Sequence, residues 1–85
     1  MTTINHNYLQ QLEANPEQEV NVIIRTNTAP TMHEVQMAEL GLTITRTYRL
    51  IKAMAATGPA KAVISLASED WVSSIEPDQK VQLYD

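Results

Sequence analysis

Apolar side chains recur at every fourth position near the start of the chain, at Ile4, Tyr8 and Leu12. This spacing places them on one stripe of a helix, which we predict over residues 3–14. The Asn-Pro pair that follows ends the helix, because a residue before proline is pushed out of the helical region. We therefore interpret residues 1–18 as a helical extension of the next domain.

The period then changes from four to two. Val20, Val22 and Ile24 alternate with the residues between them, and β-branched residues dominate this stretch. The alternation predicts a strand that turns these three side chains toward a core. A loop follows over residues 26–30.

Two further helices are predicted between the remaining strands. Thr31 and Glu34 match a capping box, so we predict a ten-residue helix that ends before Gly41, a residue suited to the left-handed position after a helix. The second helix opens with Gly58-Pro59, since a first-turn proline needs no N–H partner. Its predicted buried face consists of Ala60, Val63, Ile64, Leu66 and Ala67.

Three more strands complete the pattern, over residues 42–48, 53–57 and 72–76, and Pro77 ends the last one. The order strand–helix–strand–strand–helix–strand, with right-handed crossovers, predicts an α+β fold. We expect a ferredoxin-like βαββαβ sandwich, in which a four-stranded antiparallel sheet carries two helices on one face. The other face stays uncovered.

The domain boundaries follow from these elements. We place the ferredoxin-like domain at residues 19–77 and an extended C-terminal tail at residues 78–85. The tail is polar, but it contains three apolar residues and has an aromatic side chain at its penultimate position. A terminus without fixed structure is the common explanation, and a peptide that adds a strand to another protein is the functional one.

Composition narrows the function classes. The chain has 85 residues, of which 44% are apolar, and its ten acidic and six basic residues give a net charge of −4. This charge provides no basic field for nucleic acid or for a membrane surface. Without cysteine, disulfides, thiol nucleophiles and cysteine-bound zinc are excluded. We see no signal peptide and no membrane-length apolar run, so we expect a soluble, cytoplasmic protein.

No residue pattern indicates an enzyme, a cofactor or a metal site. His6 and His33 lie far apart in the chain, and neither has an acidic or hydroxyl partner at a recognisable spacing. Two glycines cannot form a phosphate-binding loop. Arg46, Arg49 and Lys52 form a basic cluster around a predicted hairpin, which we interpret as a solvated edge that discourages sheet-to-sheet pairing.

Three segments resemble the propeptides of subtilisin-like serine proteases and the free-standing fungal proteinase B inhibitors. They are VNVIIR, TRTYRLIKAMAATGPAKAV and ASEDWVSSIEPDQKV. Their order and spacing carry the resemblance, which extends over residues 20–84. The resemblance implies a protein inhibitor of a subtilisin-like serine protease, without catalytic residues or cofactors, that can also help its protease to fold.

In that family the uncovered sheet face packs on two parallel helices of the protease. The resemblance implies that Glu76 and Asp78 cap the N-termini of these helices, where unpaired N–H groups and a partial positive charge favour carboxylates. Without the resemblance, both residues would be interpreted as an ordinary solvated turn beside Pro77.

The family's tail lies in the active-site cleft like a cleaved substrate. By ungapped counting, the resemblance puts Tyr84 in the primary specificity pocket and Val81 in the second apolar pocket, with Gln82 and Leu83 between them. Asp85 extends past this anchor, so cleavage after Tyr84 stays open. No protease domain or secretion signal accompanies the chain, so we expect a stand-alone inhibitor that is monomeric when free.

A second function class stays open at this point. The chain could be a ferredoxin-like regulatory or interaction module that dimerises through its open sheet face and has no protease partner. A third class, a small-ligand sensor, has less support, because no convergent polar pocket can be read from the sequence.

Overall fold

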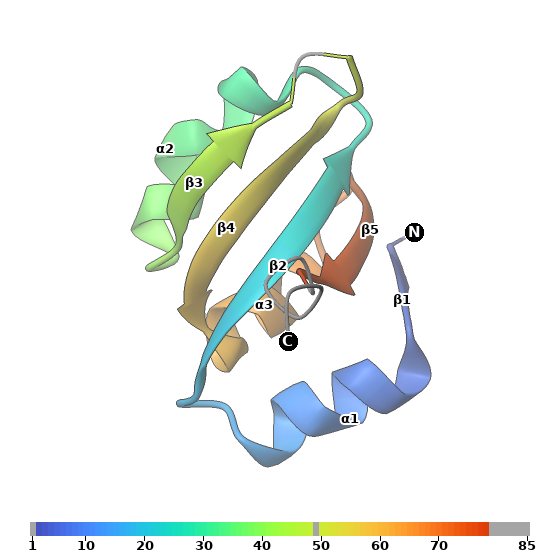
Figure 1. The fold of residues 1–85 in the computed structure, drawn as a ribbon, viewed down its shortest axis with the longest axis vertical. Helices are drawn as coiled ribbons and strands as arrows, with labels where there is room; N and C mark the ends of the chain where they lie inside the picture. The colour runs from blue at the N-terminus through green and yellow to red at the C-terminus, as the bar shows by residue number, and fades with distance from the viewer. Residues whose placement is uncertain (1, 49, 79–85) are drawn as a thin grey trace, which may run out of the picture.

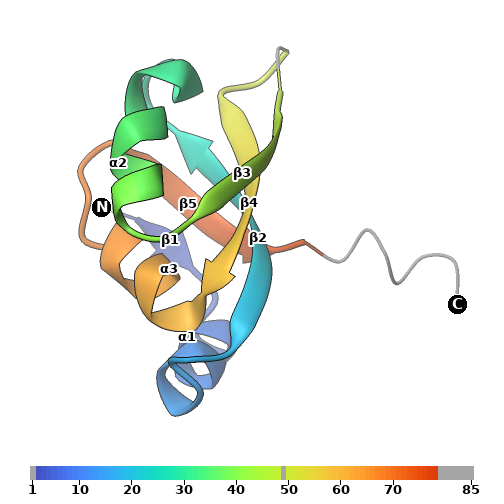
Figure 2. The same cartoon turned by 90° about the vertical axis from the view of Figure 1, so that its left-hand side faces the viewer.

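The computed structural model describes residues 2–48 and 50–78. It shows an α+β chain in which α2 and α3 cover one face of a five-stranded sheet (Figures 1 and 2). The elements are β1 (Thr3–Ile4), α1 (His6–Ala14), β2 (Glu19–Thr26), the 3-10 turn η1 (Pro30–His33), α2 (Glu34–Glu39), β3 (Thr43–Thr47), β4 (Ala53–Pro59), α3 (Ala60–Leu66) and β5 (Val72–Pro77).

Hydrogen-bonded strands follow the order β1-β5-β2-β4-β3 across the sheet. The four strands from β2 to β5 pair antiparallel, as the sequence predicts. β1 adds a fifth strand parallel to β5, with Thr3 opposite Ser74 and Ile4 opposite Ile75. The expected four-stranded antiparallel sheet is therefore a mixed five-stranded sheet.

The N-terminal segment differs from the helix predicted over residues 3–14. The side-chain oxygen of Asn5 accepts a hydrogen bond from the Tyr8 backbone N–H at 3.1 Å, so the helix starts after this cap. Ile4, expected on the helix stripe, lies in β1 and packs against the core from there. Leu12 stays on the helix, where it is 2% exposed.

The helix predicted from Thr31 to residue 40 is divided into two pieces. Pro30 opens η1, in which no side chain caps the first turn, so Thr31 does not form the expected capping box. His33 leaves the helical region with φ −118°, and α2 begins only at Glu34. The ring of His33 stacks on Trp71, a long-range contact that a local pattern does not contain.

The core lies between the covered face of the sheet and the helices. Val22 and Ile24 of β2 are fully buried in it, as predicted. Other elements contribute Leu12, Met37, Leu42, Met54, Ala56, Ala60, Ala62, Val63, Leu66, Val72 and Ile75. Ile64 and Ala67, predicted to be buried, are partly exposed and pack at the border of this cluster.

Two glycines allow the α2–β3 connection to approach β4. Gly41 has φ +93°, which confirms the left-handed conformation expected after the helix. At Gly58 an added Cβ would lie 2.7 Å from Leu42 Cδ2 and 2.9 Å from the Gly41 carbonyl oxygen. β4 continues through Pro59, which precedes α3 as its N-cap residue and does not lie in its first turn.

Candidate functional site

One face of the sheet lies opposite α2 and α3 (Figure 2). Because Val22 and Ile24 point into the core, alternation directs Ile23 and Arg25 to this opposite face. No helix among residues 2–48 and 50–78 covers it. We call this surface the open face, and its members on β2, β4 and β5 are Glu19, Asn21, Ile23, Arg25, Ala53, Ala55, Thr57, Ser74 and Glu76.

A strip of small side chains runs along the middle of the open face. Ala53 and Ala55 of β4 lie opposite Arg25 and Ile23 of β2. The two alanines are only 0% and 4% exposed, although no helix of residues 2–48 and 50–78 covers them. The partly exposed Ile23 lies beside this strip. An apolar centre with a polar rim is typical of a protein-binding patch.

Glu76 lies on the open face near the end of β5. Glu76 pairs with Ile23 on the neighbouring strand β2, and Arg25 of β2 is its diagonal neighbour. The distance from Arg25 Nε to Glu76 Oε1 is 3.9 Å, and each side chain is 51% exposed. Such an exposed pair adds little to the free energy of unfolding. The carboxylate therefore stays accessible to a partner.

Asp78 continues this pattern beyond the end of β5. Its backbone N–H donates to the Asn21 carbonyl oxygen at 2.9 Å, which keeps the chain alongside β2 past Pro77. Side chains alternate along an extended chain, so residues 76 and 78 share the open face. The two carboxylates singled out in the sequence therefore lie at the same end of one surface.

The other candidate residues, Val81, Gln82, Leu83 and Tyr84, lie outside the described residues. The last described residue before them is Asp78, whose backbone N–H donates to the Asn21 carbonyl oxygen of β2.

The N-terminal extension forms a polar cavity at the end of β5. The cavity has a volume of about 310 Å³ and is lined by Asn5, Asn7, Tyr8, Gln11 and Pro77. Burial raises the pKa of the Tyr8 hydroxyl above its ordinary value. This cavity joins segments far apart in the chain, which is why the sequence did not predict it.

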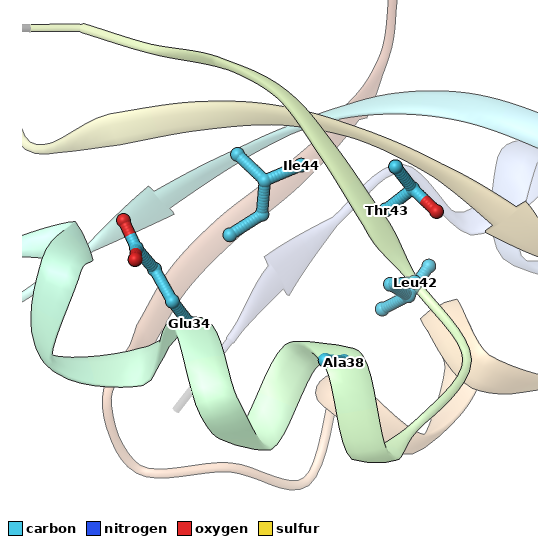
Figure 3. A pocket seen from close by; sticks show the side chains of 5 residues that line it. All are labelled: Glu34, Ala38, Leu42, Thr43 and Ile44. Atoms are coloured by element: carbon cyan, nitrogen blue, oxygen red, sulfur yellow. The ribbon is translucent and has the colours of Figure 1, made fainter.

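A second cavity, of about 450 Å³, lies between α2 and β3 (Figure 3). Its lining consists of Glu34, Ala38, Leu42, Thr43 and Ile44. Ile44 pairs with Ala56, which is buried in the core, so this cavity opens on the covered side of the sheet. It therefore belongs to a different surface from Glu76.

The two histidines have separate environments. His6 is exposed at the start of α1. The ring of His33 stacks on Trp71 with centroids 4.0 Å apart, and its Nε2 lies 2.6 Å from Thr28 Oγ1. Trp71 Nε1 donates to the Gln36 side chain at 3.2 Å, so this cluster ties the start of α2 to β5. In the described part of the chain, no three His, Cys, Asp or Glu side chains are grouped to hold a metal ion.

The β3–β4 hairpin carries a feature that the sequence interpretation missed. Leu50 is 99% exposed and Ile51 is 44% exposed at its tip. Arg46 and Lys52 are exposed on either side of them, and β3 is the outermost strand in the order, as expected for a solvated edge. Arg49 lies outside the described residues. Two adjacent apolar residues between cations in a turn were the signal available in the sequence.

None of the helices in the described ranges is both long and apolar enough to span a bilayer. Comparison of the sequence with models of known protein families and with curated proteins gave no match. The open face and its two carboxylates are therefore the features from which a function can be argued.

Proposed function

We propose that this protein is a non-enzymatic inhibitor of a subtilisin-like serine protease. The observation that carries the proposal is the position of Glu76 and Asp78, which lie together on the open face beside its apolar strip and directly before the tail. The proposal assigns no catalytic residue, cofactor or metal to the chain, and it places the protein in the cytoplasm.

The scaffold in this proposal is a ferredoxin-like domain. The strand order β5-β2-β4-β3, with α2 and α3 on one face, supports that assignment. β1 and α1 are then additions at the β5 side of the sheet. In this arrangement no helix of the described residues covers the open face, which would pack on two parallel helices of the protease through the strip of small side chains on β4.

The two carboxylates supply the directional part of the contact. The first N–H groups of a helix have no partner within the helix, and the helix dipole adds partial positive charge there. Glu76 and Asp78 would each accept hydrogen bonds from such a helix start. Arg25 keeps the Glu76 carboxylate on the open face without burying it. Docking would therefore bring N–H donors from the protease to both carboxylates.

The tail supplies the inhibitory part. In the proposal, Val81, Gln82, Leu83 and Tyr84 occupy the active-site cleft as a product-like strand, with Tyr84 in the main specificity pocket. Main-chain hydrogen bonds give affinity in such strand addition, and side-chain pockets give specificity. The large second contact through the open face slows dissociation, so the tail persists in the cleft. The same surface complementarity would let the protein assist folding of its protease.

The direct test is the inhibition constant against subtilisin, measured with a chromogenic peptide substrate. Replacing Glu76→Gln and Asp78→Asn together removes both charges and keeps the side-chain shapes. We expect the inhibition constant to rise about 3- to 30-fold, because charged groups at helix starts typically contribute about 0.3–1 kcal/mol each. Glu39→Gln, at an exposed position on α2, is the matched control and should have no effect. An unchanged constant for the double variant would refute the role of the acidic pair.

A homodimer through the open face is the second candidate function. The partly exposed Ile23 beside the strip of alanines favours it, because such a surface can also pack against its own copy. Gel filtration with and without inactivated subtilisin separates the two. A monomer that elutes with the protease supports the inhibitor, whereas a stable dimer that does not bind the protease supports the interaction module.

A further inference from the structure

The tip of the β3–β4 hairpin carries Leu50, the most exposed large apolar side chain among the described residues. Leu50 is 99% exposed and the adjacent Ile51 is 44% exposed. Single exposed apolar side chains are common in proteins and need no explanation. Two adjacent ones at a turn, joined to a candidate binding face, form a more specific feature.

Backbone contacts hold this tip at one end of the open face. The Thr26 N–H donates to the Lys52 carbonyl oxygen at 2.7 Å, so β2 ends beside the hairpin. The Ala53 N–H donates to the Ile51 carbonyl oxygen at 3.0 Å, and Ala53 is itself part of the open face. Residues 50–52 therefore extend the open face at the end where Arg25 lies. Figure 2 shows the hairpin at that end of the sheet.

Charge is distributed unevenly along this extended surface. The β3–β4 hairpin, residues 43–59, contains three cations and no acid in its sequence, although the whole chain carries −4. Arg46 and Lys52 lie on either side of the hairpin tip. Glu76 lies opposite Ile23, near the middle of β2, and Asp78 lies toward the other end, next to Asn21. One end of the surface is thus cationic with apolar side chains, and the other is anionic.

The strand geometry sets the spacing between the two ends. β2 runs from Asn21, beside Asp78, to Thr26, beside Lys52. At about 3.4 Å per residue, these two positions are roughly 17 Å apart. A partner that binds both ends must therefore present two complementary patches at that separation.

We propose that residues 50–52 form a second anchor, in which Leu50 enters an apolar depression bordered by carboxylates on the protease that binds the open face. This anchor rests on the proposed inhibitor function and deepens it. The anionic end binds helix starts and the cationic tip binds an acidic rim, so the charge pattern admits only one orientation of the sheet. In the reversed orientation, charges of like sign would face each other, which disfavours that orientation. A protease without the acidic rim would lack a partner for the cationic tip, so the charge pattern also selects among proteases.

The test compares two apolar residues that are exposed on different surfaces. Leu50→Ser removes the proposed anchor, and Val35→Ser, at a 74% exposed position on α2, is the matched control. We expect Leu50→Ser to raise the inhibition constant against subtilisin about 10- to 100-fold, the effect of losing one buried leucine. The conservative variant Leu50→Met should keep most of the affinity of the unaltered protein. Val35→Ser should change nothing.

The outcomes separate this anchor from the proposed function. If the unaltered protein does not inhibit subtilisin, the inhibitor function fails and the anchor with it. If the unaltered protein inhibits and Leu50→Ser inhibits equally well, only the anchor is refuted. Unchanged inhibition together with loss of binding to phosphatidylserine-containing vesicles would assign the tip to a lipid surface and overturn the proposal. Far-UV circular dichroism checks that each variant is folded.

The contribution of the cationic tip can be measured separately, through the association rate. Lys52→Gln should lower the association rate with subtilisin and weaken its dependence on salt, because rim charges act mainly on encounter. An association rate and salt dependence equal to those of the unaltered protein would contradict the acidic border of the proposed depression.

Discussion

Ile23 and Glu76 lie opposite each other on adjacent strands and leave the same face of the sheet. The two side chains respond differently when a partner removes water from the open face. Burial of the isoleucine is favourable, whereas burial of the carboxylate is unfavourable unless new hydrogen-bond donors replace its water. The ion pair with Arg25 is long and half exposed, so it orients Glu76 more than it stabilises the fold. In the proposed complex, affinity at this site would therefore depend on donors supplied by the partner.

Gly58 is a second single residue with a large role, because it lets β4 pack closely against the α2–β3 connection. Gly58→Ala would bring a Cβ to 2.9 Å from the Gly41 carbonyl oxygen, a backbone atom that cannot turn aside. We expect the free energy of unfolding to fall by about 1–3 kcal/mol, as for other overpacked positions. Urea unfolding followed by Trp71 fluorescence measures it. An unchanged midpoint would show that β4 and the α2–β3 connection can separate without cost.

Among the elements, the N-terminal extension contributes most beyond the predicted domain. β1 covers the edge of β5, and the Thr2 hydroxyl donates to the Val72 carbonyl oxygen at 2.9 Å. α1 contacts α3 and places Leu12 in the core. Lys61 forms an ion pair with Glu17 at 3.1 Å, which links the extension to α3 as well. These contacts fasten the strand that carries Glu76.

We therefore expect Leu12→Ala to lower the free energy of unfolding by about 2–5 kcal/mol, the usual cost of truncating a buried leucine. That is comparable with the roughly 3–5 kcal/mol that the core of so small a domain supplies. Leu50→Ala is the matched control, because Leu50 is fully exposed and its truncation leaves no cavity. Thermal unfolding of both variants checks this. Equal midpoints for the two would mean that α1 is not part of the cooperative unit.

The elements also show which features a sequence pattern can reveal. Alternation and β-branching predicted β2, and Gly41 marked the end of α2. β1 was missed because two residues are too short to show a period. The predicted helix is divided between η1 and α2 at His33, whose ring stacks on Trp71, a contact distant in sequence.

The candidate site was partly predictable. Glu76 and Asp78 were found through a family resemblance, and an acidic pair in a turn would not have been selected from its chemistry alone. Their shared face follows from the pairing of β5 with β2, which the sequence pattern implied. The polar cavity beside Pro77 and the position of Leu50 depend on how distant segments pack. Local patterns carry no information on such contacts.

For the whole molecule, the central claim is that the sheet and the tail have different functions. In the proposed function, the sheet would bind the outside of the protease and the tail would block its cleft. Removing residues 81–85 should therefore abolish competitive inhibition while leaving binding to the protease measurable through the open face. Surface-immobilised, inactivated subtilisin would detect that binding, and equal inhibition by the truncated chain would contradict this claim.

The most direct measurement is the steady-state rate of subtilisin on a chromogenic peptide, recorded at increasing concentrations of the purified full-length protein and of the substrate. The account predicts complete inhibition at micromolar concentrations or below, relieved by excess substrate as for a competitive inhibitor. Subtilisin-like proteases that stay fully active at micromolar concentrations of this protein would contradict it.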